Sequence, residues 1–322
     1  MQTGFERFAS ILVFTGGLFS TTSSWGEMPA LLVPAQDIQC PQRAADCQDL
    51  DAIVFVHGIY GGNETFKNTA TNFDWPAKFP RMVGGRSVDI YRLMYESSLL
   101  SWAKEKNPRF EAVAKAVFEA MAPLRKRKYR SIGFIAHSLG GNIVSTYIHM
   151  AKTSKGHPQR SQHGFIITLA SPVLGSQVAD LATVLKSVLG MDDDLLTSLK
   201  EENLYLRMLQ EFRQEEEEKE NRYLCRPVHL HAAYEQKYLG PLLIVTPESA
   251  AVSISQMAKS PVVGFLLDHS QIAKPAGLND EVHLWVIARV KDEFRRIGMW
   301  ETAHRMLPSE RQLCERMEFI QE

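Results

Sequence analysis

The sequence is poor in the features that mark several large classes of protein. Its four cysteines in 322 residues are too few for a fold built on disulfides, and no CxxC pair or Cys/His cluster indicates zinc. The 36 basic and 37 acidic side chains nearly cancel, so the chain lacks the basic excess of a nucleic-acid-binding protein. Its 45% of hydrophobic residues instead suffice for a sizeable globular core. Cys40 and Cys47 either close a small loop in an oxidising compartment or remain thiols.

Long hydrophobic runs are also absent, except at the N-terminus. Residues 8–26 carry no charge, and their apolar part, residues 8–19, is about as long as a signal-peptide core but short for a membrane span. We therefore expect residues 1–24 to form a signal peptide or an N-terminal anchor, followed by a leader or linker at 25–48. This predicts a protein exported to the periplasm or secreted, or otherwise anchored to a membrane.

Beyond residue 49 the hydrophobic pattern alternates between strands and helices. Continuous apolar runs predict strands buried on both faces at residues 52–56, 88–93, 131–136, 164–170, 227–234 and 242–246. Helical spacing predicts helices over residues 110–124, 140–152 and 281–297. This order indicates an α/β-hydrolase-like α/β fold, a mostly parallel sheet with helices on both faces, spanning residues 49–300 before a tail at 301–322. A Leu-rich helical segment, residues 176–226, predicts a lid-like insertion.

A six-residue motif, AHSLGG at residues 136–141, lies between the third predicted strand and the next helix. It matches the G-x-S-x-G nucleophile elbow, with Ala136 in the first position, in which a sharp turn projects the serine hydroxyl above the sheet. The turn is crowded and needs small neighbours, while the helix start directs N–H groups and a positive dipole at a developing oxyanion. Ser138 is therefore the candidate nucleophile, and His137 is interpreted as structural.

A glycine-containing loop after the first predicted strand is the candidate for the second half of an oxyanion hole. In hydrolases with a nucleophile elbow, the donors are the backbone N–H after the nucleophile and one from the loop after an early strand. The segment His57-Gly58-Ile59 therefore nominates the amides of Leu139 and Ile59. His57 is interpreted as a brace of this loop, formed by hydrogen bonding, rather than as the catalytic base.

The remaining partners are expected in the chain order serine, acid, histidine. His269 lies in a polar turn before the final helix, from which it can reach back over the sheet, and is the candidate base. Glu235 directly follows a predicted strand and would accept the Nδ1–H of that histidine. Glu248, after the next strand, and Asp268 are alternatives for the acid, although adjacent residues such as Asp268 and His269 seldom face each other.

Together these segments resemble the α/β-hydrolase superfamily, and within it the serine esterase and lipase-like branch. That branch includes the serine-active-site-containing proteins and the lipase-like inositol deacylases. The resemblance implies Ser138 as nucleophile, Glu235 as acid and His269 as base, and the chain departs from the usual pattern at Ala136, where many lipases have glycine, and in its leader. It rests on segments between about residues 51 and 290, namely VFVHGIYGG (54–62), NFDWP (72–76), FIAHSLGG (134–141), YE (234–235) and DHSQIAK (268–274).

These residues predict a serine hydrolase that cleaves carboxylic esters through an acyl-enzyme on Ser138, with no metal or organic cofactor. The expected partner is an ester, with a lipid or hydrophobic acyl ester favoured by the Leu-rich insertion, and no nucleic acid. The N-terminal segment or the lid would bring the protein close to a membrane. Thioesterase or amidase activity remains an alternative because the same constellation serves these bonds. A non-catalytic hydrolase-fold binding protein is the other alternative.

Overall fold

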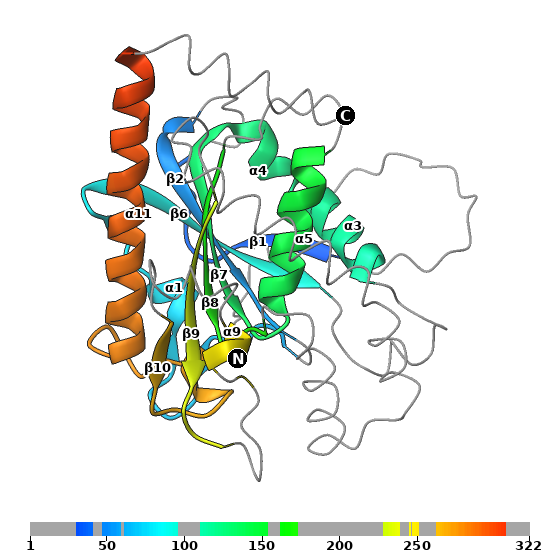
Figure 1. The fold of residues 1–322 in the computed structure, drawn as a ribbon, viewed down its shortest axis with the longest axis vertical. Helices are drawn as coiled ribbons and strands as arrows, with labels where there is room; N and C mark the ends of the chain where they lie inside the picture. The colour runs from blue at the N-terminus through cyan, green and yellow to red at the C-terminus, as the bar shows by residue number, and fades with distance from the viewer. Residues whose placement is uncertain are drawn as a thin grey trace, which may run out of the picture.

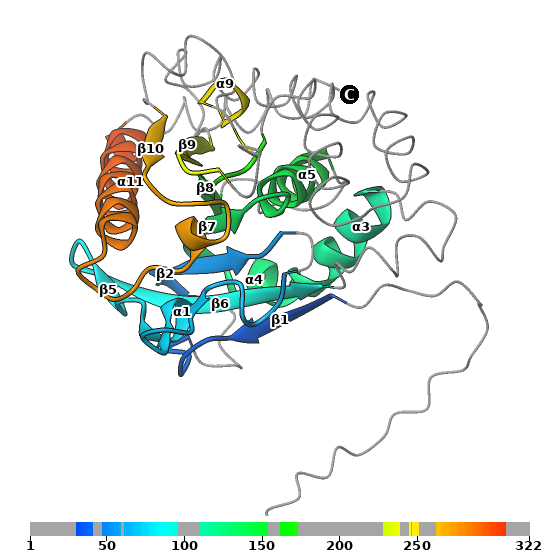
Figure 2. The ribbon, with the colours of Figure 1, turned by 90° about the horizontal axis from the view of Figure 1, so that it is seen from below.

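A twisted sheet runs through the centre of the protein and carries helices on both faces (Figure 1). This computed structural model describes residues 30–40, 47–58, 61–95, 110–153, 162–172, 228–238, 245, 247–250 and 262–306. Helices α3 (Phe110–Ala120) and α5 (Gly140–Thr153) cover one face, and α11 (Glu281–Met306) covers the other. Figure 2 shows these layers from below. The predicted α/β fold class is confirmed, whereas the predicted insertion and residues 1–24 lie outside the described residues.

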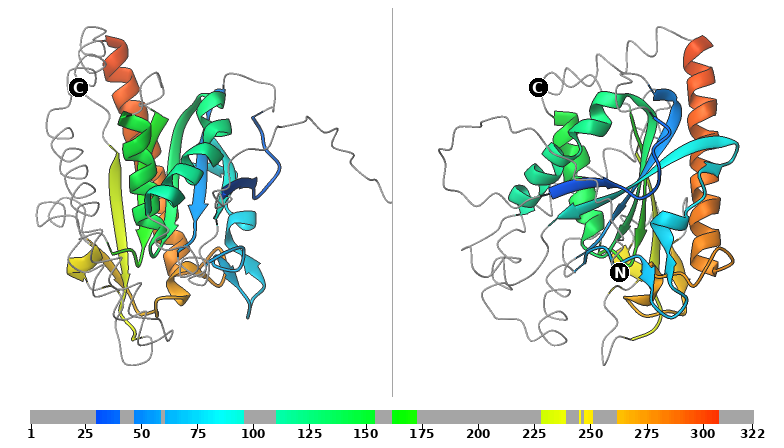
Figure 3. Two further views of the ribbon diagram at one scale, coloured as in Figure 1. Left: turned by 90° about the vertical axis from the view of Figure 1, so that its right-hand side faces the viewer. Right: turned by 180° about the vertical axis from the view of Figure 1, so that it is seen from behind.

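The central sheet is parallel from β6 to β10. Its strand order is β1-β6-β2-β7-β8-β9-β10, and every neighbouring pair from β6 onward is parallel. At one edge β1 pairs antiparallel with β6, as does the short β5. Figure 3 shows β1 (dark blue) and β9 (yellow) toward opposite edges of the sheet. The strands are β1 (Ala30–Pro34), β2 (Cys47–Val56), β5 (Met82–Val83), β6 (Arg86–Tyr95), β7 (Tyr129–His137), β8 (His163–Leu169), β9 (His229–Glu235) and β10 (Val263–Phe265).

The smaller elements surround this sheet. A hairpin of β3 (Lys67–Asn68) and β4 (Phe73–Asp74) leads into α1 (Trp75–Lys78), whose N-cap Asp74 accepts the N–H of Ala77. The others are α4 (Ala122–Arg127), α9 (Pro247–Ala250) and a 3-10 turn, η2 (Gln271–Ala273). Among the described helices, none combines the length and the apolar character needed to cross a membrane.

Burial on both faces explains why the central strands were visible as continuous apolar runs. Every residue of β8 is buried, as are eight of the nine in β7, so these strands have no polar face. Because the strands are parallel and in register, with Val56 opposite Ala136 and Ala136 opposite Thr168, their carboxyl ends meet at one edge. The residues that follow β7, β9 and β10 are thereby brought together.

Several predicted boundaries are corrected by the structure. The predicted leader, residues 25–48, contains β1 and the start of β2; β1 was missed because an edge strand keeps exposed positions and no continuous apolar run. Of the strand predicted at residues 242–246, only Val245 is among the described residues, and it is a bend just before α9; in the sheet β9 lies between β8 and β10. That strand has three residues with Gly264 at its centre, so its pattern is weak.

The helices differ from the prediction for local reasons. The helix predicted over residues 110–124 is divided between α3 and α4 at Met121. Pro123 lies in the first turn of α4, where its missing N–H is tolerated, although it cannot continue a helix from before. The final helix continues to Met306, so the predicted tail at 301–322 begins within α11 rather than after it.

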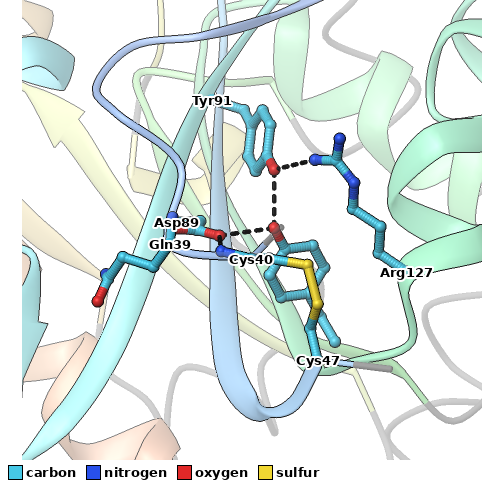
Figure 4. The surroundings of a disulfide bond; sticks show 7 residues. Gln39, Cys40, Cys47, Asp89, Tyr91 and Arg127 are labelled. Atoms are coloured by element: carbon cyan, nitrogen blue, oxygen red, sulfur yellow. Dashed lines mark hydrogen bonds between the residues drawn. A yellow bond between two sulfur atoms is a disulfide. The ribbon is translucent and has the colours of Figure 1, made fainter. Parts of the chain in front are cut away.

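A disulfide joins Cys40 to Cys47 at the start of β2 (Figure 4). The chain before it is held by a buried carboxylate, because the amides of Gln39 and Cys40 donate to the two oxygens of Asp89 at 2.7 and 3.0 Å. Of the two alternatives left open by the sequence, the structure therefore has the bonded pair.

The same carboxylate begins a chain of buried hydroxyl groups (Figure 4). The Tyr129 hydroxyl donates to Asp89 at 2.7 Å and lies 2.7 Å from the hydroxyl of Tyr91, which accepts from Arg127 at 2.7 Å. Burial raises the pKa of Tyr129, so this phenol stays protonated and remains a donor. Gln39 and Cys40, which lead into the disulfide, are thus fixed to β6 and β7 by satisfied polar groups.

Replacing both bonded cysteines, as in C40S/C47S, is expected to lower the free energy of unfolding by about 2 kcal/mol, because the bond closes a short loop and restricts the unfolded chain. Urea denaturation followed by tryptophan fluorescence measures this, with and without a thiol reductant. The reductant should destabilise the wild type and leave the double variant unchanged. Equal stability of the oxidised and reduced wild type contradicts the prediction.

Candidate active site

Ser138 occupies the turn between β7 and α5 in a left-handed backbone conformation, with φ of 53°. Such a conformation costs a non-glycine residue about 1–3 kcal/mol and persists only where its surroundings hold it. Here the Ser138 amide donates to the Leu169 carbonyl of β8 at 3.0 Å, and the Ser138 carbonyl accepts from the Gly141 amide at 3.1 Å. The neighbouring strand and the new helix therefore fix the turn from both sides.

Two glycines allow the end of β2 to approach this turn. A Cβ atom on Gly140 would lie 2.6 Å from the carbonyl oxygen of Val56 and 2.5 Å from that of His57. A Cβ atom on Gly58 would lie 2.6 Å from the Cβ of Ser138. Backbone oxygens cannot move aside as a flexible side chain can, so the motif needs glycine at position 140 for a steric reason.

The imidazole of His269 lies between Ser138 and Glu235. Its Nε2 is 3.1 Å from the Ser138 Oγ, and its Nδ1 is 3.3 Å from Glu235 Oε1. If Nδ1–H donates to the carboxylate, Nε2 is left as the acceptor for the serine hydroxyl. All three groups are at least nine-tenths buried. The structure thus brings together the three residues that the sequence nominated, from the ends of β7, β9 and β10.

The alternative acids are placed differently. Asp268 Oδ1 accepts the amides of Ser270 and Gln271 at 2.9 and 2.8 Å, so it caps its own turn. Glu248 lies in α9, and the position of its side chain is not among those that the structure describes. Glu235, by contrast, also accepts the Val245 amide at 2.6 Å, which fixes the carboxylate beneath the histidine.

His137 supports the loop of His269 rather than the serine beside it. Its Nε2–H donates to the backbone carbonyl of His269 at 2.7 Å, and the two rings lie 4.9 Å apart. Burial, together with the nearby charge of His269, lowers the pKa of His137 to about 3. His137 therefore stays neutral near pH 7 and remains a donor. The sequence indicated a structural role, but its partner is 132 residues away.

The loop after β2 is braced as expected. His57 Nδ1–H donates to the Gly58 carbonyl at 2.9 Å, and Nε2 accepts the Tyr95 amide at 3.4 Å. The His57 ring stacks on Tyr95 at 4.2 Å, and the Tyr95 hydroxyl donates to the His57 carbonyl. These contacts confirm the interpretation of His57 as a brace.

The candidate oxyanion donors are only partly covered by the described residues. Leu139 is buried and immediately precedes α5, and its carbonyl accepts the amides of Asn142 and Ile143. An N–H at such a helix start has no acceptor within the helix and is available to an anion. Ile59 lies outside the described residues, so its assignment stays a prediction.

A serine in a left-handed turn between a buried parallel strand and a helix defines the α/β-hydrolase class of protein. The chain belongs to the family described as "Putative serine esterase (DUF676)", whose model matches residues 48–229. Fold and family together place it among the serine ester hydrolases, as the sequence predicted. No curated protein sequence matches the chain.

Several solved structures are similar to the chain. The mature lipase BlEst2 of Bacillus licheniformis is 19% identical with a TM-score of 0.46, and the match covers 75% of this chain and 92% of that one. Esterase B of Lactobacillus rhamnosis, inhibited by a C6-C4 SN3 compound, is 9% identical with a TM-score of 0.45, and the match covers 88% of this chain and 91% of that one. The Vlm2 thioesterase domain is 14% identical with a TM-score of 0.39, and the match covers 81% of this chain and 96% of that one. At these TM-scores the likeness carries no conclusion about reaction or substrate.

Loss of the His137 donor is expected to impair His269 rather than substrate binding. His137→Leu should lower kcat for p-nitrophenyl acetate about tenfold, the equivalent of one buried hydrogen bond, with little change in KM. His137→Gln retains an N–H donor and should recover most of the activity. Counting active sites by fluorophosphonate titration separates a lower kcat per site from a smaller folded fraction.

The same variants have a pH signature. Because the pKa of His137 is about 3 in the folded protein and 6.5 ordinarily, falling pH protonates the unfolded chain first. The contribution of neutral His137 to the free energy of unfolding is therefore complete above pH 6.5 and decreases as the pH falls below it. The free energy of unfolding of His137→Gln should fall less steeply than that of the wild type between pH 6.5 and about 4. Identical slopes, or equal kcat for both variants, contradict the assignment.

Proposed function

We propose that the chain hydrolyses carboxylic esters through an acyl-enzyme on Ser138, with His269 as general base and Glu235 as the acid that orients it. One observation carries this proposal, the continuous series of contacts from Ser138 Oγ to His269 Nε2 at 3.1 Å and from His269 Nδ1 to Glu235 at 3.3 Å. The family supports the reaction class, and the contacts support the residue roles.

The reaction follows from these positions. Ser138 Oγ attacks the ester carbonyl while His269 Nε2 takes its proton, and the adjacent Glu235 carboxylate stabilises the imidazolium. The amides of Leu139 and Ile59 are the proposed donors to the oxyanion. His269 then protonates the leaving alcohol, and a water molecule cleaves the acyl-enzyme by the same route. These steps use only groups of the chain, so they need no metal or organic cofactor.

Labelling with a fluorophosphonate probe tests the proposal. Ser138→Ala should abolish labelling, because the probe forms its bond to an activated Oγ. Ester hydrolysis by His269→Ala and by Glu235→Gln should fall by about 10³–10⁴, as expected for groups that act together on one serine. Melting temperatures near that of the wild type establish that these variants are folded.

Matched substitutions at the alternative acids serve as controls. Asp268→Asn keeps an oxygen for the amides of Ser270 and Gln271, and both it and Glu248→Gln should retain near wild-type activity. Equal labelling of Ser138→Ala rejects the nucleophile. A loss in Asp268→Asn or Glu248→Gln as large as that in Glu235→Gln rejects the acid. A folded wild type that neither labels nor hydrolyses esters indicates the non-catalytic binding protein.

We further propose that the substrate carries a hydrophobic acyl chain. Tyr238 and Leu266, each 65% exposed, lie on the turns after β9 and β10, close in sequence to Glu235 and His269. Backbone hydrogen bonds join these two turns, from the Gln236 amide to the Phe265 carbonyl at 2.8 Å and from the Lys237 amide to the Leu267 carbonyl at 3.0 Å. Tyr238 and Leu266 thus form an exposed apolar margin on the carboxyl-end side of the sheet, which suits a lipid-like ester.

Loss of this apolar margin is expected to affect long esters selectively. The double variant Y238S/L266S should lower kcat/KM for p-nitrophenyl octanoate about tenfold and that for the acetate much less, because it removes apolar surface that a long chain covers. Met299→Ser is the control, because Met299 is also exposed, at 62%, but lies toward the C-terminal end of α11 (Glu281–Met306), away from the turns after β9 and β10. An equal loss for both esters contradicts the proposal.

The proposed compartment is an oxidising one outside the cytosol, reached through an N-terminal signal or anchor. The Cys40–Cys47 disulfide supports it, because such bonds persist in exported proteins and are rare where thiols are kept reduced. Proximity to a membrane, through the N-terminal segment or the predicted lid, is part of the same proposal and fits a lipid-like ester.

A further inference from the structure

A second cluster of polar side chains lies at the amino end of β9, away from the site at its carboxyl end. His229 and His231 are two residues apart on one strand and so share a face of the sheet. Both approach Glu293 of α11, with His229 Nδ1 at 3.0 Å and His231 Nε2 at 2.8 Å from its Oε1. The proposed ester hydrolysis uses none of these three residues.

Two imidazoles and one carboxylate form a ligand set typical of zinc. The two nitrogens and one carboxylate oxygen lie within 4.8 Å of one another. Around a tetrahedral zinc with bonds of about 2.0–2.1 Å, neighbouring ligand atoms are about 3.3 Å apart. The nitrogen–oxygen distances of 2.8 and 3.0 Å would need to open by only a few tenths of an ångström.

The other oxygen of Glu293 is held by a separate partner. Arg296 contacts Glu293 Oε2 through Nε at 2.7 Å and Nη2 at 2.6 Å, and Nη2 also donates to the Gly164 carbonyl at 3.1 Å. This leaves Oε1 directed at the histidines and fixes the carboxylate orientation, as outer partners of metal ligands do. The two imidazole ligands favour a zinc-class ion over calcium or magnesium, which prefer oxygen ligands.

The protonation states also suit a metal ion. Glu293 Oε1 faces both imidazoles, and Oε2 is paired with Arg296. In the metal-free cluster the nitrogens that face Glu293 Oε1 carry the protons, so binding an ion moves each proton to the other ring nitrogen, which a neutral imidazole allows. His229 is only partly buried.

We propose that His229, His231 and Glu293 bind a zinc-class divalent cation that fastens α11 to β9. The ion would take Nδ1 of His229, Nε2 of His231 and Oε1 of Glu293, with water completing the tetrahedron. Its role is structural, because the cluster lies at the opposite end of the strand that ends in Glu235. The competing arrangement is a closed hydrogen-bonded cluster that binds no metal.

Zinc titration of the full chain, stripped of metal by a chelator, tests this proposal. Calorimetry should show about one zinc ion per chain, and zinc should raise the melting temperature. His231→Gln and His229→Gln should each weaken zinc binding by about 100-fold or more and abolish the thermal shift. His229 is less buried than its two partners, so its replacement disturbs the packing least. His149→Gln, on α5, is the matched histidine control and should bind zinc as the wild type does.

Two results overturn the proposal. One is a wild type with no zinc-dependent heat or thermal shift, which leaves the closed hydrogen-bonded cluster. The other is unchanged binding in both His229→Gln and His231→Gln, which places the ion elsewhere. Fluorophosphonate labelling of Ser138 is read separately in each variant, so failure of the zinc site is distinguishable from failure of the esterase assignment.

Discussion

The close approach of three chain segments around Ser138 constrains the rest of the structure. The left-handed backbone of Ser138 is unfavourable by itself. It is held by a hydrogen bond to the Leu169 carbonyl in β8 and by another in the first turn of α5. On the other side the carbonyls of Val56 and His57 lie so near Gly140 that no side chain fits. The turn thus exists only where β2, β7 and β8 are parallel and in register.

Parallel register also assembles the rest of the proposed site. Glu235 ends β9, and His269 follows β10, the next strand, so both arise at the edge where β7 delivers the serine. The histidine loop is then tied in place twice, by His137 at the His269 carbonyl and by Asn68 at the Lys274 carbonyl, 2.9 Å away. The proposed base is therefore positioned by groups far away in sequence, which reduces the cost of ordering it during the reaction.

Sequence patterns were informative wherever the cause was local. The buried runs of β2, β7 and β8, and the small residues around Ser138, record burial and crowding at the positions themselves. Glu235 and His269 were nominated from chain order together with their places, directly after a predicted strand and in a polar turn before the final helix. Edges and long-range contacts were not: β1 has an exposed side, and β10 is three residues long. The support of His269 by His137, and the meeting of His231 with Glu293 over 62 residues, depend on how the sheet and α11 pack.

The buried carboxylates differ in how their charge is balanced. Asp51 pairs with Arg86 and Arg130, and Glu293 pairs with Arg296, so each has a permanent cation beside it. Among the described residues, Glu235 has no such partner except His269. Asp89, which is also buried, has hydrogen bonds from two amides and the Tyr129 hydroxyl in place of a cation. In the proposed reaction His269 becomes positive when it takes the serine proton, and the Glu235 carboxylate beside it stabilises that charge.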